Sequence, residues 1–157
     1  MRILVFSDSH GDSESILKVM DRFYPDVALH LGDGIDDLLV LEKDFPQTSF
    51  FHVRGDVDNL GDLNRFQVFD GVSIYMTHHQ FQFEIKKDRD KMTDIKKLNA
   101  HIVLFGNTHT PTLFVCDGVT FMNPGSIGKA FSFRTFGMID ISEGDFMCEV
   151  SFADLFV

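Results

Sequence analysis

Two patterns of apolar residues alternate in the first third of the chain. Residues 2–7, 27–31 and 48–53 are short apolar runs of the kind that forms buried strands. Between them, residues 13–24 and 36–43 carry apolar side chains at helical spacing, in the first segment at Ile16, Leu17, Val19, Met20 and Phe23. This part of the chain therefore predicts a β-α-β-α-β unit.

The remainder of the chain predicts mostly hairpins. Asp70-Gly71, Asp117-Gly118 and Glu143-Gly144 each separate two short apolar runs, and Asp-Gly pairs tolerate the positive φ of a tight turn. The strands predicted on either side of these turns are residues 66–69 and 72–76, 113–116 and 119–122, and 136–141 and 146–152.

A charged segment at residues 84–99 has apolar points at helical spacing and predicts a partly exposed helix, followed by a strand over 102–105. The combination of a β-α-β-α-β unit with hairpins predicts α/β layers built on mixed sheets. No repeat, linker or low-complexity stretch divides the chain, so residues 1–157 are expected to form a single domain.

Composition narrows the class of protein. No apolar run approaches the roughly 20 residues of a membrane span, and the N-terminal apolar stretch is too short for a signal peptide. Cys116 and Cys148 fit no metal or redox spacing, which predicts a reduced, cytoplasmic setting. The net charge of −10 disfavours broad contact with nucleic acid or anionic lipid, although bound cations would neutralise some of the carboxylates.

Residues able to bind metal ions follow five of the predicted strands. They are Asp8, His10, Asp33, Asp56, His78, Asn107 and His109. Ligands of open α/β sheets bind at the carboxyl ends of strands, and this mixture of oxygen and nitrogen donors suits Mn²⁺, Fe²⁺ and Zn²⁺. At one sheet edge these groups would repel one another without cations, and two ions sharing one carboxylate fit the set. Gly32, Gly55 and Gly106 precede three of the polar residues and permit tight turns into the site.

The order of the motifs resembles a known family. Asp8-x-His10, Gly32-Asp33, Gly55-Asp56-x-Asp58, Thr77-His78, Gly106-x-Thr108-His109 and Asn123-Pro-Gly-Ser126 occur in the order found in the calcineurin-like metallophosphoesterases, in particular the small bacterial phosphodiesterases of the YfcE-like group. The match runs nearly end to end, and it implies a four-layer α/β/β/α sandwich with two mixed β-sheets.

The resemblance also implies two divalent metal ions. Asp8, His10, Asp33 and His109 would hold one, and the bridging Asp33 with Asp56, His78 and Asn107 would hold the other. Mn²⁺ is the first choice, with Ni²⁺, Co²⁺, Zn²⁺ and Fe²⁺ as alternatives.

Three departures from the family pattern fall on or beside the second metal site. Asp56 replaces the usual Asn, Asn107 replaces the usual His, and His79-Gln80 stands where Gly-His often follows. The charge of Asp56 offsets the weaker Asn107 ligand, which predicts an oxygen-rich site suited to Mn²⁺ or Mg²⁺. His78 is preferred to His79 as the ligand because it directly follows the strand and Thr77.

Two functions are compatible with these features. The first is a phosphodiesterase that hydrolyses a small phosphoester by attack of a metal-bound hydroxide at a dinuclear site. It would have no catalytic side chain beyond the metal ligands, and Arg54 is a candidate contact for substrate. Val57 stands where some family members carry a histidine proton donor, which favours diesters or well-activated leaving groups.

The second function is a scaffold with a weakened second metal site. The retromer subunit of this fold is similar and also carries Arg-Gly-Asp-x-Asp, as Arg54 to Asp58 do here. Physiological substrate and oligomeric state, including a homo-oligomer, stay open.

Several of these residues have structural roles as alternatives. Asp33 suits a helix N-cap, Asp56 and Asp58 suit a loop cap, Asn107 suits a turn, and Arg54 suits a surface ion pair. His30, His52 and His101 lie within or beside apolar runs and are expected to be structural, and Asn123-Pro-Gly-Ser126 is expected to buttress the site.

Overall fold

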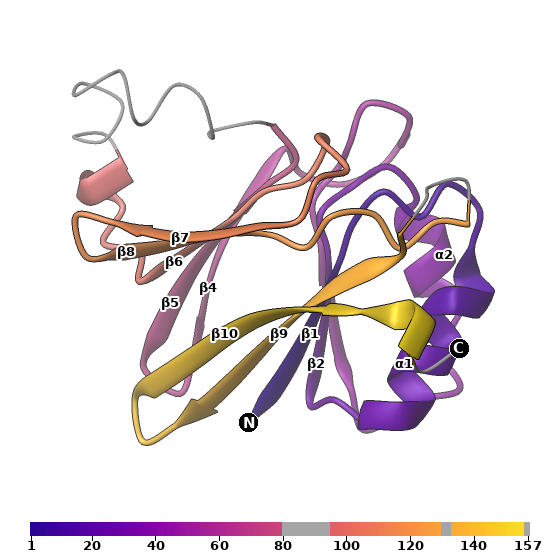
Figure 1. Cartoon of the computed structure of the whole chain (residues 1–157), viewed down its shortest axis with the longest axis horizontal. Coiled ribbons are helices and arrows are strands. Elements are labelled where there is room, and N and C mark those ends of the chain that lie inside the picture. Colours follow the sequence, from indigo (N-terminus) through magenta and orange to yellow (C-terminus); the bar gives the residue numbers. More distant parts are fainter. Residues whose placement is uncertain (80–94, 130–132, 156–157) are drawn as a thin grey trace.

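The computed structural model describes residues 1–79, 95–129 and 133–155. Its strands form two five-stranded sheets that pack face to face (Figure 1). The first sheet has the order β10-β9-β1-β2-β3. In it β1, β2 and β3 run parallel, and β9 is antiparallel to both of its neighbours, β1 and β10. The strands are β1 (Arg2–Phe6), β2 (Val27–His30), β3 (Ser49–His52), β9 (Thr135–Ser142) and β10 (Asp145–Phe152).

The second sheet has the order β4-β5-β6-β8-β7. β5, β6 and β8 run parallel to one another, whereas the two edge strands are antiparallel to their neighbours. The strands are β4 (Asn64–Phe69), β5 (Val72–Thr77), β6 (Ile102–Leu104), β7 (Thr112–Cys116) and β8 (Val119–Asn123). Both sheets are therefore mixed, as predicted.

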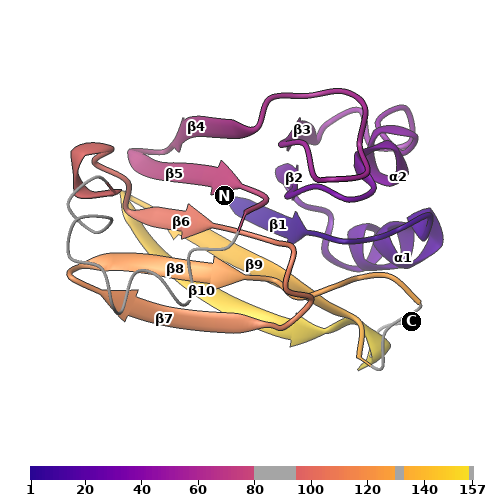
Figure 2. The ribbon, with the colours of Figure 1, turned by 90° about the horizontal axis from the view of Figure 1, so that it is seen from above.

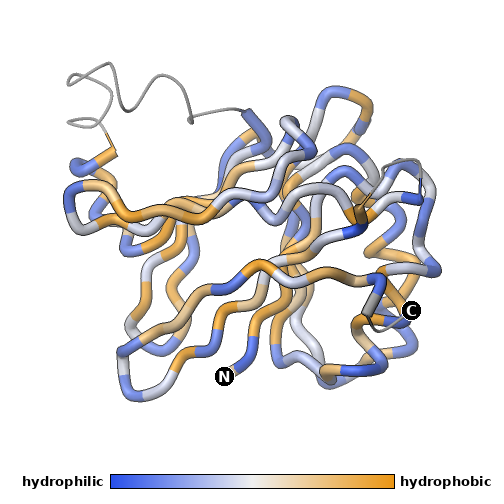
Figure 3. The backbone as a smooth tube through the Cα atoms, viewed as in Figure 1, coloured by the Kyte–Doolittle hydropathy of each residue, from blue (hydrophilic) through white to orange (hydrophobic). Residues whose placement is uncertain are grey.

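Strand β1 is buried on both faces because it lies at the centre of the molecule. Ile3 and Val5 pack into the core between the sheets, and Leu4 and Phe6 pack against the helices on the other face. Side chains of a strand alternate between faces, so a continuous apolar run is what such a strand requires. Along the chain, the strands are mostly apolar and the turns that join them are mostly polar (Figure 3).

Two helices cover the outer face of the first sheet (Figure 2). Helix α1 (Ser13–Phe23) is N-capped by Asp12, whose carboxylate accepts from the Ser15 N–H, and it ends at Tyr24 in the left-handed conformation. Helix α2 spans Ile35–Leu39, and a short 3-10 helix at Ala153–Leu155 follows β10. No helix of the described residues is long and apolar enough to cross a membrane.

The predicted strands and hairpins are confirmed, and so is the sandwich of two mixed sheets. The helix predicted over 36–43 is too long. It ends at Leu39, after which the Leu41 and Glu42 N–H groups donate to carbonyls only three residues back. These tight turns still bury Leu41 and Phe45 in the core.

Of the helix predicted over 84–99, residues 95–97 are helical, and residues 84–94 lie outside the described part of the chain. Ile95 packs on the outer face of the second sheet with Val103 and Phe121.

Candidate metal centre

Five of the predicted ligands gather where β1, β2, β5 and β6 end. They form two clusters, Asp8 with His10 and His109, and Asp8 with Asp33 and His78. Within each cluster the ligand atoms lie within 4.8 Å of one another. Asp8 belongs to both clusters. We call them the open cluster (Asp8, His10, His109) and the buried cluster (Asp8, Asp33, His78), because His10 is exposed whereas every member of the second is buried.

Asp8 is fully buried, and its two carboxylate oxygens differ in their contacts. Oδ2 accepts from the Ser7 hydroxyl at 2.5 Å and from the Asn107 N–H at 3.2 Å. Oδ1 lies 3.1 Å from His109 Nε2 but makes no hydrogen bond with the residues that the structure describes. Burial raises the pKa of Asp8 from its ordinary value, and the Ser7 hydroxyl and the nearby histidines only partly oppose this. A carboxylate oxygen that is buried without a hydrogen bond is a suitable ligand for a cation.

The ring of His78 is also oriented by a hydrogen bond. Its Nδ1 lies 2.7 Å from the Leu31 carbonyl, which fixes the hydrogen on that nitrogen and leaves the Nε2 lone pair free. Within the described part of the chain Nε2 has no hydrogen bond, and it lies 3.5 Å from Asp33 Oδ2. The other oxygen of Asp33 accepts from the Val57 N–H at 3.0 Å. In Asp33 and in His78, one polar atom is therefore held by a backbone group while the other faces the cluster. This set of oxygen and nitrogen donors fits a divalent ion.

The backbone of the site is strained. Asp8, His10, Asp33, Asn107 and His109 all have φ between 46° and 66°, in the left-handed region. Non-glycine residues there cost about 1–3 kcal/mol each and persist where surrounding contacts hold them. The helix N-cap alternative for Asp33 is wrong, because the N-cap of α2 is Gly34.

The Asn123-Pro-Gly-Ser126 segment buttresses two of these loops, as predicted. The Ser126 hydroxyl donates to the Asp8 carbonyl at 2.7 Å. The Asn123 side-chain amide donates to the Gly106 carbonyl and to the Thr108 hydroxyl, both at 2.9 Å. One turn therefore joins the loop after β1 to the loop after β6.

The three glycines before the polar residues are needed mainly for space. Gly32 has φ of +102°, and a Cβ there would lie 2.5 Å from the Gly55 nitrogen. A Cβ at Gly55 would collide with Asp33, and one at Gly106 with the Ser7 hydroxyl. Neither Gly55 nor Gly106 has a left-handed φ. The expectation of tight turns therefore holds for Gly32, whereas close approach of neighbouring chains explains the other two.

Asp58 is a loop cap. Its carboxylate accepts from the N–H groups of Asp33, Gly34, Ile35 and Gly55 at 2.7–3.2 Å. Burial alone would raise the pKa of Asp58, but these backbone donors outweigh it and lower the pKa. Asp58 therefore joins the loop that carries Asp33 to the loop after β3.

The remaining predicted residues lie around the two clusters. Asp56 is exposed and belongs to neither cluster. Asn107 is half-buried and contributes its backbone N–H to Asp8. His79 is exposed, so His78 is the histidine of this pair that joins Asp8 and Asp33. Arg54 is half-buried, and its backbone N–H donates to the Asp62 carbonyl at 2.8 Å.

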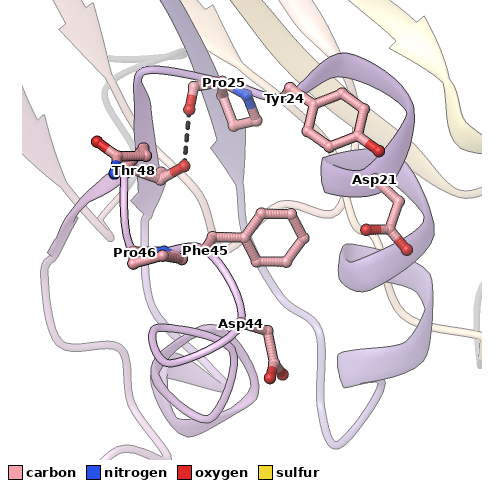
Figure 4. Close-up of a pocket in the computed structure, with 8 residues that line it drawn as sticks. Asp21, Tyr24, Pro25, Asp44, Phe45, Pro46 and Thr48 are labelled. Atoms are coloured by element: carbon pink, nitrogen blue, oxygen red, sulfur yellow. Dashed lines mark hydrogen bonds between the residues drawn. The ribbon is translucent and has the colours of Figure 1, made fainter.

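A pocket of about 220 Å³ lies at the opposite end of β2 and β3 (Figure 4). Tyr24 and Pro25 line it from the segment before β2, and residues 44–48 line it from the segment before β3. The Thr48 hydroxyl donates to the Pro25 carbonyl at 2.7 Å across its edge. None of its lining residues is a predicted ligand, so this pocket is separate from the metal centre.

The chain is similar in sequence and in fold to known proteins. A model of the calcineurin-like phosphoesterase superfamily domain matches residues 1–144. A probable metallophosphoesterase of Mycoplasma pneumoniae is 30% identical over 129 residues, which are 80% of this chain and 79% of that protein. A crystal structure of a predicted phosphoesterase from Streptococcus pneumoniae has a TM-score of 0.76 at 24% identity, and the match covers 98% of this chain and 90% of that one.

Two further solved structures share the fold. Vps29 of Entamoeba histolytica in complex with zinc has a TM-score of 0.73 at 20% identity, over 98% of this chain and 99% of that one. An archaeal phosphodiesterase has a TM-score of 0.72 at 20% identity, over 96% of this chain and 100% of that one. The family model, the Mycoplasma relative and the ordered motifs lead to one conclusion: the chain belongs to the calcineurin-like phosphoesterase superfamily.

Proposed function

We propose that the protein is a divalent-metal-dependent phosphodiesterase with a dinuclear site. The observation that carries the proposal is the convergence of five candidate ligands from four strand ends: Asp8, His10, Asp33, His78 and His109. Asp8 Oδ1 and His78 Nε2 are buried and make no hydrogen bond with any described residue. Asp56 and Asn107 complete the proposed second ligand set, and Mn²⁺ is the first choice of ion.

Divalent ions bound there would lower the pKa of a coordinated water and neutralise charge on the phosphate oxygens. The protein's own part is to hold the ligands in place. The Val57 N–H and the Leu31 carbonyl orient Asp33 and His78, and the Ser126 hydroxyl fixes the carbonyl of Asp8. The side chain of Val57 offers no proton to a leaving group, so the proposed substrates are diesters or esters with well-activated leaving groups.

Family membership supports a hydrolase of a small phosphoester. The archaeal neighbour, whose structure is described as that of a phosphodiesterase, supports the diester. We also infer a single metallophosphoesterase domain over residues 1–157, since both sheets contribute to one core. The unpaired cysteines, Cys116 and Cys148, support a cytoplasmic setting.

The test is metal analysis of the purified protein combined with metal rescue. Protein stripped with chelator and resupplied with Mn²⁺, Ni²⁺, Co²⁺ or Zn²⁺ is assayed on bis(p-nitrophenyl) phosphate and on p-nitrophenyl phosphate. Two equivalents of metal with turnover of the diester, both lost in Asp33→Ala, are expected. No hydrolysis of either ester with any of the four metals would contradict the proposal.

The second candidate is a scaffold of the metallophosphoesterase fold. It is supported by the likeness to Vps29 and by the exposed position of Asp56, which leaves the second ligand set incomplete within the clusters. Because that Vps29 structure itself contains zinc, metal binding does not separate the two candidates. Metal binding without turnover would favour the scaffold, and turnover would exclude it as the main role.

A further inference from the structure

Ser9 lies between Asp8 and His10, and its hydroxyl belongs to a buried hydrogen-bond network. Ser9 is 1% exposed, and His30 is fully buried. Ser9 Oγ lies 3.1 Å from His30 Nε2 and donates to Asp37 Oδ2 at 2.6 Å. The same carboxylate oxygen accepts from the Gly11 N–H at 2.7 Å. One side chain of α2 therefore holds both residues that flank His10.

The direction of each hydrogen bond follows from the available donors. The Gly32 N–H donates to His30 Nδ1 at 3.1 Å, so that nitrogen carries no hydrogen. Burial lowers the pKa of His30 to about 3, so the ring is neutral at pH 7 and its hydrogen is on Nε2. Nε2–H donates to Ser9 Oγ, and the Ser9 hydrogen is left for Asp37, which is closer than the Gly34 carbonyl at 3.1 Å.

The loop needs such support because of its backbone. Asp8 and His10 have φ of 55° and 46°, and these left-handed residues stand on either side of Ser9. The loop also lies close to the start of α2, since a Cβ at Gly34 would be 2.7 Å from Asp37 Oδ2 and 3.0 Å from the His10 nitrogen. A contact at Ser9 therefore restrains both neighbours at once.

We propose that Ser9, His30 and Asp37 form a relay that positions Asp8 and His10 for metal binding. The inference rests on the proposed function, because it assumes that these two side chains bind the ion. Ser9 is a positioning residue, since its hydroxyl is engaged by His30 and Asp37. Mutation of residues that orient metal ligands typically lowers the affinity for the ion about 10- to 100-fold.

The test is calorimetric titration of the metal-free protein with Mn²⁺, compared between wild type and Ser9→Ala. The dissociation constant for Mn²⁺ is expected to rise about tenfold in the variant.

Ser73→Ala is the matched control. Ser73 is also buried, its hydroxyl lies 2.8 Å from His101 Nδ1, and it donates to the Asn99 carbonyl at 2.7 Å. It stands at the start of β5, whereas His78 follows the end of that strand. Ser73→Ala is expected to lose a similar amount of stability in urea while its Mn²⁺ affinity stays within about twofold of wild type.

A second pair of variants covers the case in which Ser9→Ala does not fold. Asp37→Leu removes the acceptor and is expected to weaken Mn²⁺ binding about tenfold, whereas Asp37→Asn keeps an acceptor oxygen and is expected to stay within about threefold. Equal Mn²⁺ affinity in Ser9→Ala and Ser73→Ala, or in Asp37→Leu and wild type, would overturn the relay. Absence of Mn²⁺ binding by the wild-type protein would also overturn the relay. Wild type that binds Mn²⁺ without hydrolysing any ester would refute the phosphodiesterase, while the ratio of affinities would still support the relay.

Discussion

The two clusters share Asp8 but are held in different ways. In the buried cluster, His78 is fully buried and each side chain has one face bound by the protein, through the Leu31 carbonyl, the Val57 N–H or the Ser7 hydroxyl. In the open cluster, His10 is exposed and the side chain of His109 is 30% exposed.

This difference divides the site into a rigid side and an accessible side. The buried cluster lies where the loops of Asp33 and Gly55 touch, and Asp58 ties both by their backbone N–H groups. In the open cluster, the Ser126 hydroxyl donates to the Asp8 carbonyl, and Asp37 accepts hydrogen bonds from Ser9 and Gly11 on either side of His10. The side of His10 is therefore open to solvent, whereas the candidate ligands of the buried cluster are enclosed by the protein.

The largest expected effect is that of Asp8→Asn, because Asp8 is the residue common to both clusters. We expect loss of both metal equivalents and a fall in kcat/KM of at least about 1000-fold, or about 4 kcal/mol. The unfolding free energy of the metal-free protein should stay the same or rise by about 1 kcal/mol, because the amide removes a buried charge whose pKa burial has raised.

Metal titration, steady-state kinetics and urea denaturation measure these quantities for Asp8→Asn. If the variant still bound one equivalent of metal at wild-type affinity, Asp8 would not be needed by both clusters.

The second prediction compares a glycine beside each cluster. Gly32→Ala should destabilise the protein by about 3 kcal/mol, because its Cβ would meet the Gly55 backbone and its φ is +102°. Gly11→Ala, next to His10 of the open cluster, should lose only about 1 kcal/mol, since its φ is +93° and no atom of the described residues lies within 4 Å of the added Cβ. Urea denaturation of the metal-free variants measures both. Equal losses would mean that the two loops are packed alike.

The third prediction concerns pH. His30 is the last residue of β2 and is fully buried, and this burial lowers its pKa to about 3. The unfolded chain binds a proton near pH 6.5 and the folded chain does not, so this contribution to stability is complete above about pH 6.5 and is lost as the pH falls toward 3. Between pH 7 and pH 5 the expected loss is about 2 kcal/mol.

The measurement is urea denaturation at both pH values with chelator present, for wild type and for His30→Asn. The variant should be less stable at pH 7, and its stability should change less between the two pH values. The same pH dependence in both proteins would show that His30 is not the group that titrates.

The smallest expected effect is that of Arg54→Gln. Arg54 precedes the Gly55 loop beside the buried cluster, in a chain of net charge −10, so its guanidinium would attract an anionic phosphoester. KM for bis(p-nitrophenyl) phosphate should rise about threefold, or about 0.7 kcal/mol, with kcat unchanged. Arg22→Gln, in the last turn of α1, is the matched control and should change neither constant. An unchanged KM in Arg54→Gln would remove the residue from the substrate site.

The amino-acid pattern by itself determined the strands, the hairpins and the candidate ligands of the site. Apolar runs and Asp-Gly turns act over a few residues, so β1 and the β7–β8 hairpin were predictable without any knowledge of the fold. The ligand motifs were equally readable, because a short apolar run followed by Asp or His marks a strand end. The same local pattern overextended α2, since it does not distinguish a helix from the tight turns that follow Leu39.

Only the tertiary structure decided how these parts meet. The Asn107 N–H reaches Asp8 across 99 positions of sequence, and the Ser126 hydroxyl reaches it across 118. The four backbone contacts of Asp58 join the loops after β2 and β3, and the hydrogen bonds of Ser9 join the loop after β1 to β2 and α2. Such contacts join residues that are distant in the chain, and no local period encodes them. The sequence therefore names the candidate ligands, and the fold determines which of them face one another.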